Sequence, residues 1–180
     1  MTTATTLPEP GEATVADRVQ ISRRLIEQAR EELAGGDRLQ ATEKVWGAFA
    51  QMMKAHGQQR GWLNLGSHRT VGHIARQLDA EYGEIAVASA FIAADNGHRN
   101  FYDNEMSPPE ISEIIFVVAN VLPQLERALE ESPRPVVVTE ENVWRISTLT
   151  GRQDLEVGDA SPVGFSNTHD GGAARDDDGA

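Results

Sequence analysis

The sequence predicts an all-α protein, an antiparallel bundle of four to five helices with a disordered N-terminus and an acidic C-terminal tail. Apolar residues recur at helical spacing through five segments, most of these segments are bounded by capping residues, glycine or proline, and strand-like patterning is confined to one short valine-rich stretch. We therefore expect a flexible lead-in at residues 1–14, a helical bundle at 15–131, and a mostly disordered tail at 132–180 that contains a docking segment at 136–149.

The first two predicted helices are separated by a glycine pair. The first begins near Val15 and ends at Gly35–Gly36, because glycine is favoured just past a helix C-terminus. Asp37 then caps a second helix, which ends between Gly57 and Gly61. The loop that follows leads into a third helix at 68–82.

The last two predicted helices lie between Gly83 and Glu131. The fourth is rich in alanine, which lets neighbouring helices approach closely, and it ends or bends at Gly97. The fifth opens with serine and proline at 107–109. Its residues 114–118 are apolar around the whole circumference, so they need cover from other helices or from a second subunit. We expect a homodimer.

Composition limits the class of protein. The net charge is −12, which opposes general nucleic-acid binding but allows a local basic site. The chain has no cysteine, and it has neither a secretion signal nor an apolar run long enough for a membrane span. We expect a cytoplasmic protein with no membrane partner.

One window of this acidic chain contains no acidic residue. It lies between Glu43 and Asp79 and holds five Lys or Arg residues and three histidines. The sequence predicts a site for an anion or a nucleotide phosphate, with Trp62 available to stack on a base; its candidate ligand-binding residues are Arg60, Trp62, His68 and Arg69. The alternative interpretation is ordinary solvated surface.

A second group of polar residues shares one helix face if the fourth helix continues past Gly97. Asp95, His98, Arg99 and Tyr102 stand at spacings of three, four and seven, and together they suit acid–base chemistry. A polar network that closes the end of the bundle is the alternative. We expect no metal site and no cofactor, since the histidine spacing is unsuitable and Gly-rich phosphate loops are absent.

The chain resembles the HEPN-type helical domains over about residues 27–130, and most closely their archaeal and bacterial repeat-family branch. The resemblance is carried by Ala29 to Leu33, Gly36–Asp37, Ala41, Glu43 to Ala48, Lys54–Ala55, Arg60 to Trp62, His68, and His98 to Tyr102. It implies a helical bundle, commonly dimeric, with a role in nucleotide or RNA biology. Many such proteins are metal-independent RNases with a motif in which four to six residues separate an arginine from a histidine.

That RNase motif is incomplete in this sequence. Arg99–Asn100 matches its opening, but Asn104 stands where histidine is expected, and asparagine cannot shuttle a proton near neutral pH. The catalytic candidates are His98, Arg99, Tyr102 and Asn104. We therefore expect a non-catalytic or vestigial HEPN-like protein that binds a nucleotide, an RNA end or a protein partner, the last through the C-terminal tail.

Two alternatives remain at this point. The chain could be a metal-independent RNase, the toxin of a toxin–antitoxin pair, using Arg99 with His98 or Arg60 with His68. It could also be a structural adaptor. Cleavage of RNA would indicate the RNase, and retention of RNA without cleavage would indicate the binding protein. Absence of both would indicate the adaptor.

Overall fold

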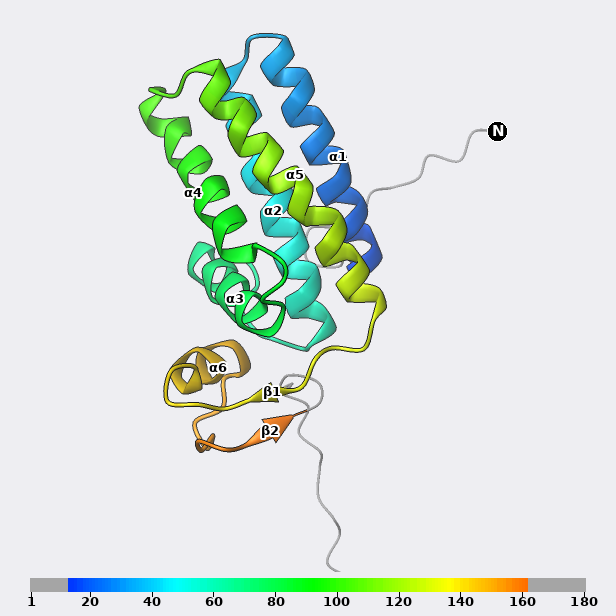
Figure 1. Ribbon diagram of the computed structural model, residues 1–180, viewed down its shortest axis with the longest axis vertical. Coiled ribbons are helices and arrows are strands. Elements are labelled where there is room, and N and C mark those ends of the chain that lie inside the picture. The colour runs from blue at the N-terminus through cyan, green and yellow to red at the C-terminus, as the bar shows by residue number, and fades with distance from the viewer. Residues whose placement is uncertain (1–12, 162–180) are drawn as a thin grey trace, which may run out of the picture.

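A computed structural model describes residues 13–161. This part of the chain contains six helices and two very short strands, one before and one after the last helix (Figure 1). They are α1 (Val15–Ala34), α2 (Arg38–Gln59), α3 (His68–Glu81), α4 (Val87–Asp103), α5 (Pro108–Glu130), β1 (Val136–Val137), α6 (Val143–Thr150) and β2 (Ala160–Ser161). The all-α prediction is confirmed. Most of the predicted lead-in and the closing acidic run lie outside the described residues.

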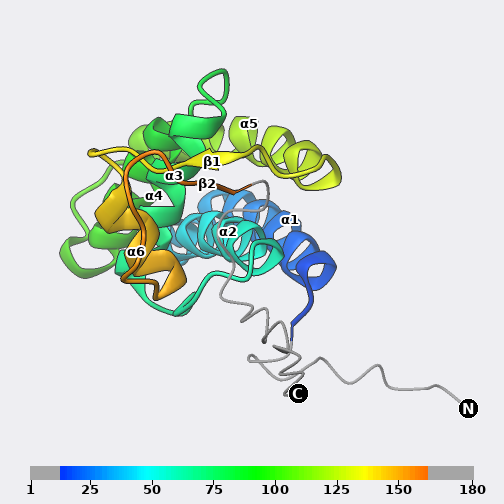
Figure 2. The same ribbon diagram turned by 90° about the horizontal axis from the view of Figure 1, so that it is seen from below.

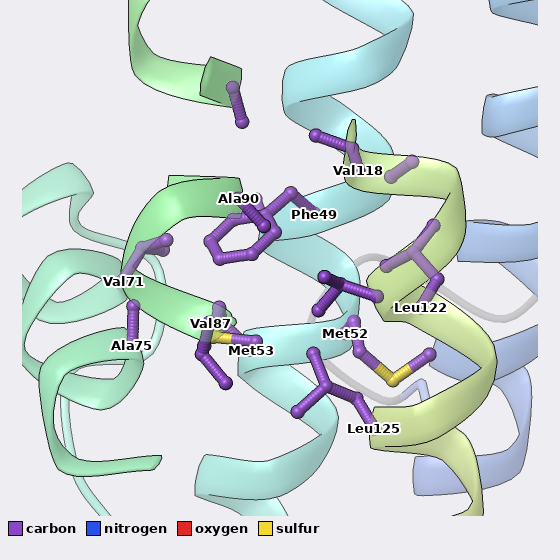
Figure 3. Close-up of a cluster of buried hydrophobic side chains, with 14 of the residues drawn as sticks. Phe49, Met52, Met53, Val71, Ala75, Val87, Ala90, Val118, Leu122 and Leu125 are labelled. Atoms are coloured by element: carbon purple, nitrogen blue, oxygen red, sulfur yellow. The ribbon is translucent and has the colours of Figure 1, made fainter. Parts of the chain in front are cut away.

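Four helices, α1, α2, α4 and α5, lie side by side, and α3 crosses the end of the bundle (Figures 1 and 2). Helix α2 is central. Its Phe49, Met52 and Met53 are fully buried and point toward residues of α3, α4 and α5 (Figure 3). Burial of this aliphatic and aromatic surface is the main stabilising contribution to the bundle.

The ends of the helices explain why they begin and end where they do. The Asp37 carboxylate accepts a hydrogen bond from the Gln40 amide at 2.9 Å. The amide and hydroxyl of Ser107 both donate to the Glu110 carboxylate, at 2.7 and 2.6 Å, which is the capping-box arrangement. Both predicted starts are therefore correct.

Helix α4 continues through Gly97 to Asp103 instead of ending there. A Cβ atom at Gly97 would lie 3.6 Å from Ile114 and 3.7 Å from Thr42, in ordinary contact with both side chains. Gly97 therefore sits where α4 packs closely on α2 and α5. The continuation keeps Asp95, His98, Arg99 and Tyr102 on one helix, as their spacing requires.

The part of the C-terminal region that the structure describes differs from the predicted disordered tail. Strands β1 and β2 pair antiparallel, and Val136, Val138, Ile146 and Leu155 form a small core of their own. Leu149 of α6 belongs instead to the main core, and its carbonyl accepts a hydrogen bond from the Leu63 amide at 2.7 Å. Residues 136–149 thus pack against the loop after α2 and against α3.

Most of the apolar run in α5 is covered by the chain itself. Ile114, Ile115 and Val118 are buried, while Phe116 is 66% exposed. The surface left for a second subunit is therefore narrower than the sequence suggested. Among the described helices, none is both long and apolar enough to cross a bilayer.

Candidate functional site

The most developed polar cluster lies where α2, α4 and the start of α3 meet. It consists of Glu43 and Trp46 from α2, His68 from α3, and Asp95, His98 and Arg99 from α4; we refer to it as the two-histidine cluster. It joins residues that were predicted from the sequence to belong to two separate sites. The packing of α2 and α3 on α4 brings them together.

Asp95 connects a histidine to an arginine. One carboxylate oxygen lies 2.8 Å from His68 Nε2, and the other lies 2.9 Å from a terminal nitrogen of Arg99. Asp95 is mostly buried, its side chain 13% exposed, whereas that of Arg99 is 72% exposed. The carboxylate therefore fixes two groups that remain accessible to solvent.

His98 has a carboxylate partner of its own. Its Nδ1 lies 2.6 Å from a carboxylate oxygen of Glu43, and both side chains are partly buried. A carboxylate at one ring nitrogen orients an imidazole and selects which nitrogen carries the proton. Each histidine is thus held through one nitrogen, while His68 Nδ1 and His98 Nε2 have no hydrogen-bond partner within residues 13–161.

Trp46 supports both imidazoles. Its ring is stacked on His68 at 4.3 Å between centroids and on His98 at 5.1 Å. The two imidazole centroids are only 5.4 Å apart, whereas rings on opposite faces of Trp46 would be separated by close to the sum of the two stacking distances. Both imidazoles therefore lie on the same side of the indole, next to each other.

The two remaining catalytic candidates lie beyond this pair. Tyr102 is 73% exposed and meets the His98 ring edge-on at 5.8 Å. Asn104 ends α4 in the left-handed conformation, with φ of 51°, a position that favours asparagine or glycine. Its place in the sequence is therefore explained by helix termination. Asn100 also has a structural role, since its buried side-chain oxygen Oδ1 accepts hydrogen bonds from the backbone amides of Glu105 and Met106.

The predicted phosphate site does not assemble. Arg60 is 1% exposed and forms a buried ion pair with Glu81, with nitrogen–oxygen distances of 2.8 and 2.6 Å. Its guanidinium also lies over the ring of Trp62, which is only 3% exposed. The prediction that Arg60 and Trp62 contact a ligand was wrong, because both side chains face the interior. His68 and Arg69 remain exposed on α3.

Glu43 and Trp46 were not predicted from the sequence as site residues. They are three residues apart, so they share one face of α2, and this spacing was the available signal. Nothing in the sequence alone shows which helix that face meets. No group of three or more His, Asp or Glu side chains within residues 13–161 is arranged to hold a metal ion.

Comparison with known family models places the chain beside an archaeal family. The model of the archaeal PaREP1/PaREP8 family matches residues 17–122, which include every member of the two-histidine cluster. No curated protein and no solved structure matches the chain significantly. The match agrees with the expected likeness to an archaeal repeat family, while the wider HEPN likeness stays a prediction.

Proposed function

The chain belongs to the archaeal PaREP1/PaREP8 family, and we propose that it is a metal-independent ribonuclease whose acid and base are His68 and His98. The observation that carries the proposal is the pair of adjacent imidazoles, 5.4 Å apart, each oriented by a carboxylate and each with one uncommitted nitrogen. The sequence alone favoured a non-catalytic role because its arginine–histidine motif is incomplete, with Asn104 in place of the histidine.

The chemistry needs two proton transfers. One imidazole removes the proton of a ribose 2′-hydroxyl, the 2′-oxygen attacks the adjacent phosphorus, and the bond from phosphorus to the 5′-oxygen breaks. The other imidazole donates its proton to the departing 5′-oxygen. The products are a 2′,3′-cyclic phosphate and a 5′-hydroxyl, so no water and no redox partner is consumed. Arg99 can donate hydrogen bonds to the phosphate oxygens as charge develops there.

The second candidate is the binding protein expected from the sequence. It is favoured by the charge of the cluster, in which two carboxylates outnumber the single guanidinium. The permanent charges of the cluster therefore do not stabilise the negative charge that develops on a reacting phosphate. In this interpretation the polar network stabilises the bundle, and RNA or a nucleotide binds without reacting.

A cleavage assay on single-stranded RNA in the presence of a metal chelator separates these functions. We expect cleavage with 2′,3′-cyclic phosphate ends and no cleavage of DNA of the same base sequence, since DNA lacks the nucleophile. His68→Gln and His98→Gln should each lower the rate by about 10²–10⁴-fold, the usual contribution of a general acid or base. Arg24→Ala on α1 serves as a control with unchanged rate.

Three results would reject catalysis by the two histidines. One is RNA that is retained but not cleaved, which supports the binding protein. Another is cleavage that persists in both histidine variants while circular dichroism shows intact helices, which would point to a contaminating nuclease. The third, absence of both binding and cleavage, would support the adaptor.

We also propose that the protein is a homodimer in the cytoplasm, the compartment favoured by the absence of cysteine. Apolar surface on the outer side of α1 and α5 supports the dimer. Exposed Phe116 borders a pocket of about 400 Å³ that Leu33, Ala34 and Ile115 also line. A two-fold axis there would place the same aromatic and apolar surface on both sides of the interface.

A further inference from the structure

A group of cations lies along α3 and α6, next to the two-histidine cluster but outside it. Arg69, His73 and Arg76 are at positions i, i+4 and i+7 of α3, so they follow one face of that helix. Helix α6 packs against α3 (Figures 1 and 2) and adds Trp144 and Arg145. We refer to these five residues as the α3–α6 basic face.

The arginines of the α3–α6 basic face all influence one residue, His73. Burial, and then the charges of Arg76, Arg145 and Arg69, lower the pKa of His73 below its ordinary value. Arg145 is affected in the same way, since burial and the charge of Arg76 lower its pKa, although Glu141 and Glu81 oppose this change. The charge of Arg76 therefore acts on Arg145, and the charges of all three arginines act on His73.

The arginines of the α3–α6 basic face are not paired with a carboxylate within the described residues, unlike several other arginines. Arg23, Arg30, Arg99, Arg134 and Arg152 each form an ion pair with a carboxylate. Within residues 13–161, Arg69 and Arg76 have neither an ion pair nor a hydrogen bond, and Arg145 uses only its Nε, which donates to Gln77 at 3.1 Å. An unneutralised cluster in a chain of net charge −12 is a surface that an anion would stabilise.

An exposed aromatic ring and an unsatisfied polar atom complete the face. Trp144 is 63% exposed, and it meets the His73 ring edge-on at 5.0 Å. His73 itself is 7% exposed, and its Nε2 has no hydrogen-bond partner among the described residues. An open indole beside arginines is the combination with which proteins bind single-stranded nucleic acids, since any base can stack on it.

We propose that the α3–α6 basic face binds the phosphate backbone of single-stranded RNA, with Arg69, Arg76 and Arg145 on phosphates and Trp144 stacked on a base. Arg69 directly follows His68 at the start of α3, so this face begins one residue from the two-histidine cluster. The choice of RNA over other single strands rests on the proposed ribonuclease function. The binding surface itself does not, because its geometry is independent of the acid–base pair.

The test is the binding of a fluorescein-labelled oligouridylate to the full chain, measured by anisotropy over a range of salt concentrations. Binding should weaken as salt rises, since each neutralised phosphate releases counterions. Arg69→Ala and Arg76→Ala should each weaken binding by roughly five- to tenfold at low salt and reduce the slope of log affinity against log salt by about 0.7. Trp144→Ala should weaken binding with no change in slope.

The controls are Arg24→Ala on α1 and Arg127→Ala on α5, which remove the same charge from exposed arginines with no ion pair inside the described part of the chain. They should leave the affinity within about twofold, as general charge effects are small at moderate salt. Equal weakening by the controls, or no binding at all, would overturn the proposal. Competition by UMP as effective as by the oligonucleotide would also overturn it, since a free nucleotide would then be the ligand.

The same preparations separate this inference from the proposed function. His68→Gln and His98→Gln should lose cleavage, while their binding of the oligouridylate should still depend on Arg69 and Arg76. If the native chain binds through the α3–α6 basic face and never cleaves, the ribonuclease proposal fails and this inference stands. If it cleaves with rates that Arg69→Ala and Arg76→Ala leave unaffected at subsaturating RNA, this inference fails and the ribonuclease proposal stands.

Discussion

Arg60 shows how much the meaning of a charged residue depends on its surroundings. It ends α2 and reaches Glu81 at the end of α3, and Gln77 also donates to this carboxylate at 2.8 Å. The Arg60 side chain is fully buried and that of Glu81 is 5% exposed, so removing one partner leaves a buried charge without compensation. The pair therefore links two helices.

Arg60→Ala should lower the free energy of unfolding by about 3–5 kcal/mol, because Glu81 would stay buried and unpaired. Urea denaturation followed by circular dichroism measures this. The double variant Arg60→Met, Glu81→Leu should recover much of the loss, since it removes both charges at similar volume. If instead Arg60→Ala is as stable as the native chain and loses RNA affinity, Arg60 is a ligand-binding residue after all.

His56 makes the stability depend on pH. It is fully buried, its Nε2 lies 3.0 Å from the Leu125 carbonyl, and burial, with the charge of Arg60 adding to it, lowers its pKa to about 3. Between pH 6.5 and 3 the unfolded chain binds a proton there that the native chain does not, so stability falls as pH falls. The slope from this group reaches at most about 1.4 kcal/mol per pH unit.

His56→Gln should remove that contribution while its amide can still donate to the Leu125 carbonyl. Urea denaturation at intervals from pH 7 to 4 should therefore give a free energy of unfolding that falls less steeply for the variant. Parallel curves for the two proteins would contradict the assignment. Effects of the surface carboxylates cancel in this comparison because both proteins contain them.

At the scale of helices, the sequence was informative where local chemistry decides the outcome. Asp37 and Ser107 mark helix starts through hydrogen bonds within one turn, so the sequence pattern is enough to predict them. Arg60 and Trp62 were misjudged because only the packing of the α2–α3 loop puts them in the interior. His68 and His98 could not be paired from the sequence, because the contact between α3 and α4 brings them together.

Helix α6 was missed for a related reason. Its eight residues are too few to form a stable helix in isolation, and they gain stability from contacts with the bundle. Leu149→Ala should therefore lower the free energy of unfolding of the whole protein by about 2–5 kcal/mol. Val157→Ala, at a position that is 61% exposed, should change it by less than about 0.5 kcal/mol. A single urea transition measures both, and an unchanged Leu149→Ala would mean that α6 is detached in solution.

At the scale of the whole molecule, the two proposed RNA-contacting regions and the proposed dimer surface involve different helices. The two-histidine cluster and the α3–α6 basic face are formed by α2, α3, α4 and α6, whereas exposed Phe116 is on α5. Between α1 and α5 a second pocket of about 490 Å³ is lined by Ile26, Met52 and Leu122 among others. A dimer formed through α1 and α5 would leave both proposed RNA-contacting regions accessible in each subunit.

Phe116→Asp tests this arrangement. Phe116 is 66% exposed in the single chain, so aspartate there is solvated and the monomer should remain folded. In the dimer the same carboxylate would be buried twice beside apolar surface, which should weaken association by at least about 100-fold, or 2.7 kcal/mol. Ile92→Asp on α4, at a position 59% exposed, is the matched control and should leave the dimer intact. Sedimentation velocity at micromolar concentration measures the oligomeric state of each protein. The α1–α5 interface would be ruled out if the native protein sediments as a monomer, or if both variants dissociate equally.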